Sequence, residues 1–107
     1  MNTEWTFETE RISSKDEHGE LIAEATFHEK ANGEFDIDHT YVVPRFRGQG
    51  IADDMMKALT GLMREKGVRV TASCSYANAW LKKHKTEYAD IISGELESEA
   101  VACRITP

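Results

Sequence analysis

Two arginines and two glycines lie close together in the segment Val-Val-Pro-Arg-Phe-Arg-Gly-Gln-Gly, residues 42–50. Arg45 and Arg47 carry positive charge and forked donors that suit phosphate oxygens. Gly48 and Gly50 have no side chain, so a ligand can approach the backbone closely there. If a helix begins after this turn, its first N–H groups have no internal partner and favour an anion. The pattern predicts a phosphate-binding turn; the alternative is a helix-capping turn with solvated arginines.

Two other residues offer reactive side chains. Cys74 follows a short β-branched segment and is a candidate nucleophile, because a thiolate attacks carbonyl carbon readily. His39 lies near the end of an earlier strand-like segment and is a candidate partner, able to promote thiolate formation or accept a proton from an amine. The alternatives are a buried structural cysteine and a histidine on a half-buried strand face.

The region before these motifs predicts an antiparallel meander of three strands. Residues 4–12 alternate with a strand period, and residues 21–29 form a second strand-like run. Asn32 and Gly33 are typical of a tight hairpin turn. We therefore expect the chain to pair with itself locally up to Pro44, which cannot donate a ladder hydrogen bond.

The third predicted strand covers residues 34–43 and leads directly into the arginine–glycine turn. A regular period of two places its largest side chains on one face. These side chains are Phe35, Ile37, His39 and Tyr41.

Beyond the turn, apolar residues recur at helical spacing over residues 51–66, and Gly67 is a typical helix stop. The later elements expected are a strand over 68–74, a helix over 75–84 capped by Ser75, a helical turn over 87–92 and a final strand over 96–105. The resulting order, βββ-α-β-α-β, describes an α+β fold. A chain of 107 residues should form a single domain, residues 1–107.

The composition is that of a globular protein, with 40% hydrophobic and 30% charged residues. No apolar run approaches the roughly 20 residues that span a bilayer, and the N-terminus lacks the pattern of a secretory signal. Cys74 and Cys103 are too few for a disulfide scaffold, so we expect a cytoplasmic protein with no membrane partner. No Cys/His spacing matches a zinc site, so we expect no metal.

The net charge of −6 is unevenly distributed. Residues 1–29 contain eight acidic and two basic residues, whereas the rest of the chain contains eleven of each. An acidic surface repels nucleic-acid phosphates, which argues against a nucleic-acid partner. It is compatible with a cationic partner such as an amine, and the alternative is a solubilising surface.

The segment Arg45-x-x-Gly48-x-Gly50-Ile51-Ala52 resembles the pyrophosphate-binding motif of the GCN5-related (GNAT) acetyltransferases. With Cys-Ser-Tyr-Ala-Asn-Ala-Trp-Leu-Lys-Lys-His and the later Glu-Tyr-Ala-Asp-Ile-Ile, it looks like the minimal GNAT-like family of short predicted acetyltransferases. The resemblance runs from about Leu21 to Ile92. It implies a GNAT-like fold, a mostly antiparallel mixed sheet with two or three helices, without the N-terminal helices that shape the acceptor pocket in longer members.

The resemblance also implies an acetyl-CoA site. The end of the third strand would pair with the pantetheine arm, the turn would hold the pyrophosphate, and the second helix would contact other parts of CoA. The implied cofactor-binding residues are Val42, Val43, Arg45, Arg47, Gly48, Gln49, Gly50, Ile51, Ala52, Asn78 and Lys82.

For the chemistry, the resemblance implies Cys74 near the acetyl group as the candidate nucleophile, with His39 beside it. Tyr76 is a weaker candidate for a general acid, and we expect it to pack in the core instead. Asp53 and Asp54 would repel phosphate if they faced it, so we expect both to point away from the site.

Two functional hypotheses follow. The first is an acetyl-CoA-dependent N-acetyltransferase acting on a small-molecule or peptide amine, either directly or through an acetylated Cys74. The second is a module that binds CoA or acyl-CoA without turnover. We expect the protein to be a monomer under either hypothesis.

Overall fold

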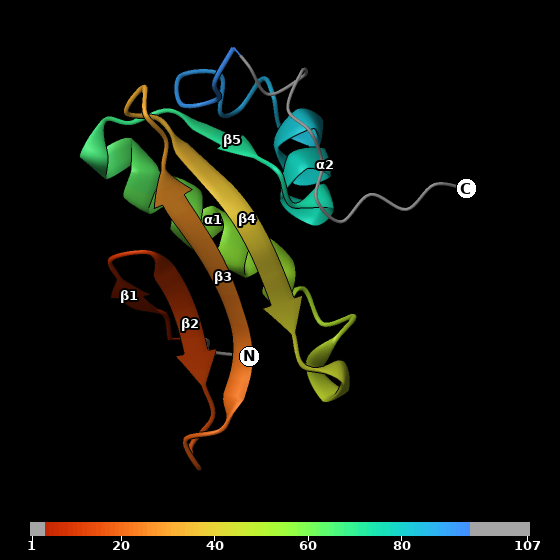
Figure 1. Ribbon diagram of the computed structural model, residues 1–107. Helices are drawn as coiled ribbons and strands as arrows, with labels where there is room; N and C mark the ends of the chain where they lie inside the picture. Colours follow the sequence, from red (N-terminus) through yellow and green to blue (C-terminus); the bar gives the residue numbers. More distant parts are fainter. Residues whose placement is uncertain (1–3, 95–107) are drawn as a thin grey trace.

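The computed structural model describes residues 4–94 and contains a five-stranded sheet with the strands in sequence order (Figure 1). Neighbouring strands from β1 to β4 are antiparallel, and β5 is parallel to β4. The strands are β1 (Thr6–Glu8), β2 (Arg11–Lys15), β3 (Leu21–Glu29), β4 (Phe35–Val42) and β5 (Val70–Ala72). The helices are the 3₁₀ turn η1 (Pro44–Phe46), α1 (Ile51–Lys66) and α2 (Ser75–Lys83).

The prediction of one strand over residues 4–12 is wrong, because this segment folds back on itself as β1 and β2. Glu8 pairs with Arg11, and the Arg11 guanidinium bonds the carboxylates of Glu8 at 3.0 Å and Glu24 at 2.8 Å. These charged contacts across three strands stabilise the tight turn. The antiparallel meander therefore has four strands instead of three. The predicted final strand over 96–105 lies outside the described residues.

Helix α1 has the predicted bounds and passes behind β3 and β4 (Figure 1). Its fully buried side chains fall at helical spacing, as expected for a helix packed on a sheet. They include Met55, Leu59 and Met63, and the strands contribute Phe27 and Ile37 to the same core. This packing fixes the start of α1 beside the end of β4.

Helix α2 begins at Ser75, one residue earlier than a Ser75 cap would require. Cys74 is the N-cap residue and makes no capping bond with its side chain, so the predicted role of Ser75 is wrong. The buried Asn78 side chain donates to the Ala72 carbonyl at 2.9 Å, which ties α2 to the end of β5. No helix among the described residues combines the length and apolar character needed to cross a bilayer.

β4 and β5 separate after a short parallel ladder. The register joins Ile37 to Ala72, and the Cys74 N–H then donates to the Ile37 carbonyl at 3.1 Å. Beyond this point β4 continues to η1 while the other segment turns into α2 (Figure 1). The edge of β4 that faces β5 is therefore unpaired with β5 from Asp38 onward.

Candidate functional site

A groove of about 470 Å³ lies where β4, the turn after it, α1 and α2 meet. It contains a subset of the predicted cofactor-binding residues. That subset comprises Val42, Arg47, Gly48, Gly50, Ile51 and Ala52. The structure thus brings the backbone turn, one arginine and the start of a helix together around one cavity.

The backbone of the turn leaves open space above its glycines. Gly48 and Gly50 have φ angles of 81° and 79°, which lie in the left-handed region that favours glycine. A Cβ atom added at either position would meet no other atom within 4 Å. The Asp54 N–H donates to the Gly50 carbonyl, so the preceding N–H groups of the helix have no intrahelical acceptor. This end of the groove is suited to an anion.

The two arginines of the turn have different roles. The Arg47 Nε donates to the Val42 carbonyl at 2.8 Å, and its guanidinium lies 5.8 Å from the centre of the Tyr41 ring. These contacts hold Arg47 at the groove. Arg45 instead pairs with Asp16 at 2.8 Å and Glu20 at 3.3 Å, near the β2–β3 turn, and does not line the groove.

The other predicted cofactor residues lie outside the groove lining. The Val43 N–H donates to the Ile22 carbonyl at 2.9 Å, and the Gln49 amide donates to the Arg45 carbonyl at 3.2 Å. Asn78 is buried against the end of β5, and Lys82 is exposed on α2. The hydrogen bonds of Val43, Gln49 and Asn78 shape the backbone around the groove.

Cys74 lies just behind the groove. Its side chain is buried, and its Sγ is 3.3 Å from the hydroxyl of Thr40, which lines the groove. A nucleophilic thiol needs access to its electrophile, and Cys74 is 3% exposed and does not line the groove, whereas Thr40 does. The geometry therefore places Cys74 next to the Thr40 end of the groove without exposing it.

His39 and Cys74 are on opposite sides of β4. One extra residue, Asp38, forms a β-bulge, so that Ile37 pairs with Phe27 while His39 pairs with Thr26. The predicted strand face is therefore wrong after Ile37. Because Thr40 contacts Cys74, the preceding His39 side chain points to the other face.

On that other face, the His39 ring stacks near Tyr41, with ring centres 6.5 Å apart. Its Nε2 lies 4.0 Å from a carboxylate oxygen of Glu24. The strand that carries His39 does neighbour the strand that leads to Cys74, since β4 pairs with β5. The structure nevertheless does not bring the imidazole of His39 to the thiol of Cys74.

Tyr76, in the first turn of α2, lines the groove and is 40% exposed, so the expectation that it packs in the core is wrong. Its partial burial raises the pKa of the phenol, and the nearby charge of Asp53 acts in the same direction. A phenol is protonated at neutral pH at its ordinary pKa of about 10, and both effects act in the same direction. Tyr76 therefore presents a protonated hydroxyl to the cavity.

Asp53 also lines the groove, contrary to the expectation that it points away. The Trp80 Nε1 donates to its carboxylate at 2.7 Å, and Lys57 pairs with it at 3.2 Å. The Trp80 hydrogen bond is the main cause of the lowered pKa of Asp53, and Lys57 contributes further. The contact joins α1 to α2 and keeps the carboxylate at the α2 end of the groove, whereas Asp54 is exposed.

We expect Asp53→Asn to lower the free energy of unfolding at neutral pH by about 1 kcal/mol, because the variant loses a charged acceptor that is partly exposed. The pKa of Asp53 is lower in the folded state than in the unfolded state. Its contribution to the free energy of unfolding is therefore present above the unfolded-state pKa of about 3.9, and it is lost as the pH falls through the folded-state pKa. Urea unfolding of both proteins at about pH 7 and about pH 3 checks this. Equal stability differences at the two pH values would contradict it.

Two solved structures show the fold at low sequence identity. A *Vibrio cholerae* integron cassette protein matches with a TM-score of 0.51 and 19% identity, covering 91% of this chain and 60% of that chain. Nourseothricin acetyltransferase matches with a TM-score of 0.50 and 19% identity, over 58% of this chain and 38% of its own. The present chain thus corresponds to a little over half of one protein and a smaller part of the other. A search of curated proteins found no match.

A closer structural match is a GCN5-like protein from *Staphylococcus aureus*, solved in solution by NMR. It shares 32% identity and a TM-score of 0.70, and the alignment covers 85% of this chain and 88% of that one. The family model of the GCN5-related N-acetyl-transferases matches residues 11–91, which include the whole groove. Because the family model covers most of the chain and the fold and groove agree with it, the chain belongs to the GCN5-related N-acetyltransferase family.

Proposed function

We propose that this protein is an acetyl-CoA-dependent N-acetyltransferase that binds acetyl-CoA in the groove and transfers the acetyl group to an amine. The observation that carries the proposal is the open turn of Gly48 and Gly50 at the start of α1, at one end of the groove. Arg47 supplies a positive charge at the same end. A diphosphate fits this combination of backbone N–H groups, open space and guanidinium.

The unpaired edge of β4 supports the placement of an extended, amide-containing arm. Since β5 leaves the sheet after Ala72, the edge of β4 that faces away from β3 has no β5 partner beyond Ile37, and the groove is lined there by Thr40, Tyr41 and Val42. An extended ligand can add to such an edge through main-chain hydrogen bonds. The arm would run from the turn toward Thr40 and Tyr76, where the reactive end of the cofactor would lie.

When bound, acetyl-CoA supplies an acetyl thioester at that end. Attack by a neutral amine would form the C–N bond and break the C–S bond, and Tyr76 would donate its proton to the departing sulfur. The proton lost from the amine would pass to water, and water would return a proton to the Tyr76 phenolate, which restores the enzyme. Because Cys74 is buried next to Thr40, we favour direct transfer over an acetylated cysteine.

The charge of the protein supports a cationic acceptor. The chain carries a net charge of −6, and many of its acids lie in the first 29 residues. The Arg11 guanidinium compensates the carboxylate of Glu24, but the chain as a whole retains its acidic excess. An amine that arrives as an ammonium ion is attracted to such a surface before it loses its proton.

A turnover assay with a panel of small primary amines and lysine-containing peptides tests the function. We expect release of free CoA thiol, together with a 42 Da increase in one acceptor measured by mass spectrometry. Gly48→Glu is the matched inactive control. Saturable acetyl-CoA binding with no turnover across the panel would favour the alternative, a binding module.

A further inference from the structure

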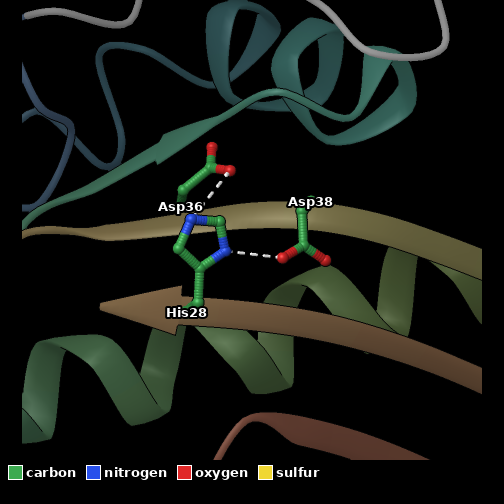
Figure 2. Close-up of side chains that lie close together, drawn as sticks. All are labelled: His28, Asp36 and Asp38. Carbon is green, nitrogen blue, oxygen red and sulfur yellow. Dashed lines mark hydrogen bonds and ion pairs between the residues drawn. The ribbon is translucent and has the colours of Figure 1, made fainter. Parts of the chain in front are cut away.

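A second cluster of polar side chains lies outside the groove, on the strands β3 and β4. Figure 2 shows His28 from β3 and Asp36 and Asp38 from β4 pointing toward one another. Each residue offers a nitrogen or oxygen ligand atom within 4.8 Å of the others. The acetyl-transfer chemistry proposed above uses none of the three.

Asp36 is the buried member of the cluster and is 3% exposed. The backbone N–H of Ser73 donates to one of its carboxylate oxygens at 2.7 Å, and the Ser73 hydroxyl donates to the other at 2.6 Å. Both oxygens act as acceptors, so the carboxyl group is held in a fixed orientation. A buried anion is stable only if a cation or further donors compensate its charge.

A second carboxylate orients the imidazole of His28. The Thr26 hydroxyl donates to one oxygen of Asp38, and the other oxygen lies 2.6 Å from the Nδ1 of His28. When the ring is neutral and Nδ1 is the donor, the lone pair of Nε2 is available on the other side of the ring. The hydrogen bond with Asp38 raises the pKa of His28, so a metal ion must compete with a proton for this nitrogen. This carboxylate–histidine pair is the arrangement that commonly fixes a metal-binding imidazole.

The distance between His28 and Asp36 is compatible with a bridging metal ion. The Nε2 of His28 lies 3.8 Å from the Oδ2 of Asp36, which is too long for a hydrogen bond. A cation with bonds of about 2.1 Å to nitrogen and oxygen can bridge two atoms up to about 4.2 Å apart. The two atoms therefore face each other at a separation that a metal ion can span.

A buried hydroxyl group lies next to Asp36 on the neighbouring strand, β5. Thr71 pairs with Asp36 in the parallel ladder, so both side chains leave the same face of the sheet. The Thr71 hydroxyl is buried and has no hydrogen-bond partner among the residues that the structure describes. The Thr71 hydroxyl beside Asp36 is therefore available for a further hydrogen bond.

We propose that His28 and Asp36 bind a divalent transition-metal ion, with Asp38 as the positioning carboxylate and water completing the coordination. One imidazole and one carboxylate suit Zn²⁺, Co²⁺ or Mn²⁺ better than they suit Ca²⁺. The ion compensates the buried charge of Asp36 and links β3 to β4 at the bulge formed by Asp38. Solvent can reach it because the His28 side chain is 47% exposed.

The test uses the whole chain, with Co²⁺ as the probe at about pH 8, since the metal must displace any proton on the histidine. We expect saturable binding of one ion per chain by calorimetry and a rise in melting temperature at saturation. We also expect a visible absorption spectrum of Co²⁺ with nitrogen and oxygen ligands. His28→Ala should abolish all three signals.

Two further variants separate direct binding from positioning. Asp38→Asn should weaken Co²⁺ affinity by about 10- to 100-fold without abolishing it, as expected for an orienting group. His18→Ala is the matched control, because His18 is an exposed histidine beside Glu17 in another part of the chain, and it should bind as the wild type does. Asp36 is a poorer test position, since its loss would also break both bonds to Ser73.

Equal Co²⁺ affinity in the wild type and His28→Ala would overturn the proposal, as would an absence of saturable binding. A spectrum dominated by thiolate-to-cobalt charge transfer, unchanged in His28→Ala, would also overturn it by placing the ion at a cysteine. None of these measurements depends on acetyl-CoA. Failure of the metal site and failure of the proposed acetyltransferase function are therefore distinguishable.

Discussion

Gly48→Glu should remove measurable binding of CoA while the protein remains folded. The new side chain would occupy the open space above the turn, where no protein atom lies within 4 Å of the Cβ position. It would also place a carboxylate near the expected site of the pyrophosphate, at the start of α1. Charge repulsion and steric exclusion act together here, so we expect affinity to fall by at least about 100-fold, equivalent to about 2.7 kcal/mol. Titration calorimetry with CoA measures this directly.

The positive φ of Gly48 makes any other residue strained there, so the variant needs a control that carries the same strain. Gly33→Glu provides it. Gly33 has a φ of 86°, lies in open space and belongs to the β3–β4 turn, outside the groove lining. We expect this variant to lose a similar amount of stability and to bind CoA normally. Unchanged CoA affinity in folded Gly48→Glu would refute the proposed pyrophosphate site.

The parts of the fold that could be predicted from the sequence depend on neighbouring residues. The bounds of α1 follow from its helical apolar spacing and from Gly67, whose left-handed backbone ends the helix. The glycine turn is likewise a short segment whose geometry needs little from the rest of the chain. This locality explains why the glycine turn at one end of the groove could be predicted, while the arrangement of side chains around Thr40 at the other end could not.

The direction of the His39 side chain depends on the bulge at Asp38. Regular alternation predicts that His39 shares a face with Ile37, but the extra residue in β4 reverses the faces beyond it. The bulge is associated with contacts between strands: Asp38 accepts from Thr26 and contacts His28, and both residues belong to β3. Pairing of this kind is not visible in the period of a single strand. The same reason explains why the His28 cluster was not predicted.

The contacts of Asp53 are a second example of an interaction that could not be predicted from the sequence. Its bond to Trp80 joins residues 27 positions apart on two helices. The sequence predicts that an acidic residue suits the first turn of α1, because it complements the helix dipole. It does not show that an indole N–H from another helix will hold the carboxylate at the groove. Exposure of Tyr76 depends in the same way on how α2 sits beside α1.

Tyr76→Phe should lower kcat by about 100-fold while leaving acetyl-CoA affinity nearly unchanged. The substitution removes only the hydroxyl that we propose as the proton donor to the departing sulfur, and general acid catalysis typically contributes about 10²- to 10⁴-fold. The wild-type phenol is protonated at neutral pH, and the raised pKa of Tyr76 acts in the same direction. Steady-state kinetics with the best acceptor from the amine panel, together with calorimetry, separates the effect on kcat from any effect on binding.

Cys74→Ser is the matched comparison, because it tests the other reactive side chain at the same end of the groove. Thr40 lies 3.3 Å from the sulfur and offers a partner to a serine hydroxyl, so we expect a stability cost near the lower end of about 1–3 kcal/mol. If transfer is direct, this variant should keep most of its turnover, and the wild type should gain no 42 Da adduct from acetyl-CoA alone. Loss of turnover in folded Cys74→Ser, with an acetyl adduct on Cys74 of the wild type, would establish the cysteine as the nucleophile. Tyr76 would then protonate the sulfur of CoA before the amine reacts, and Tyr76→Phe should slow formation of that adduct.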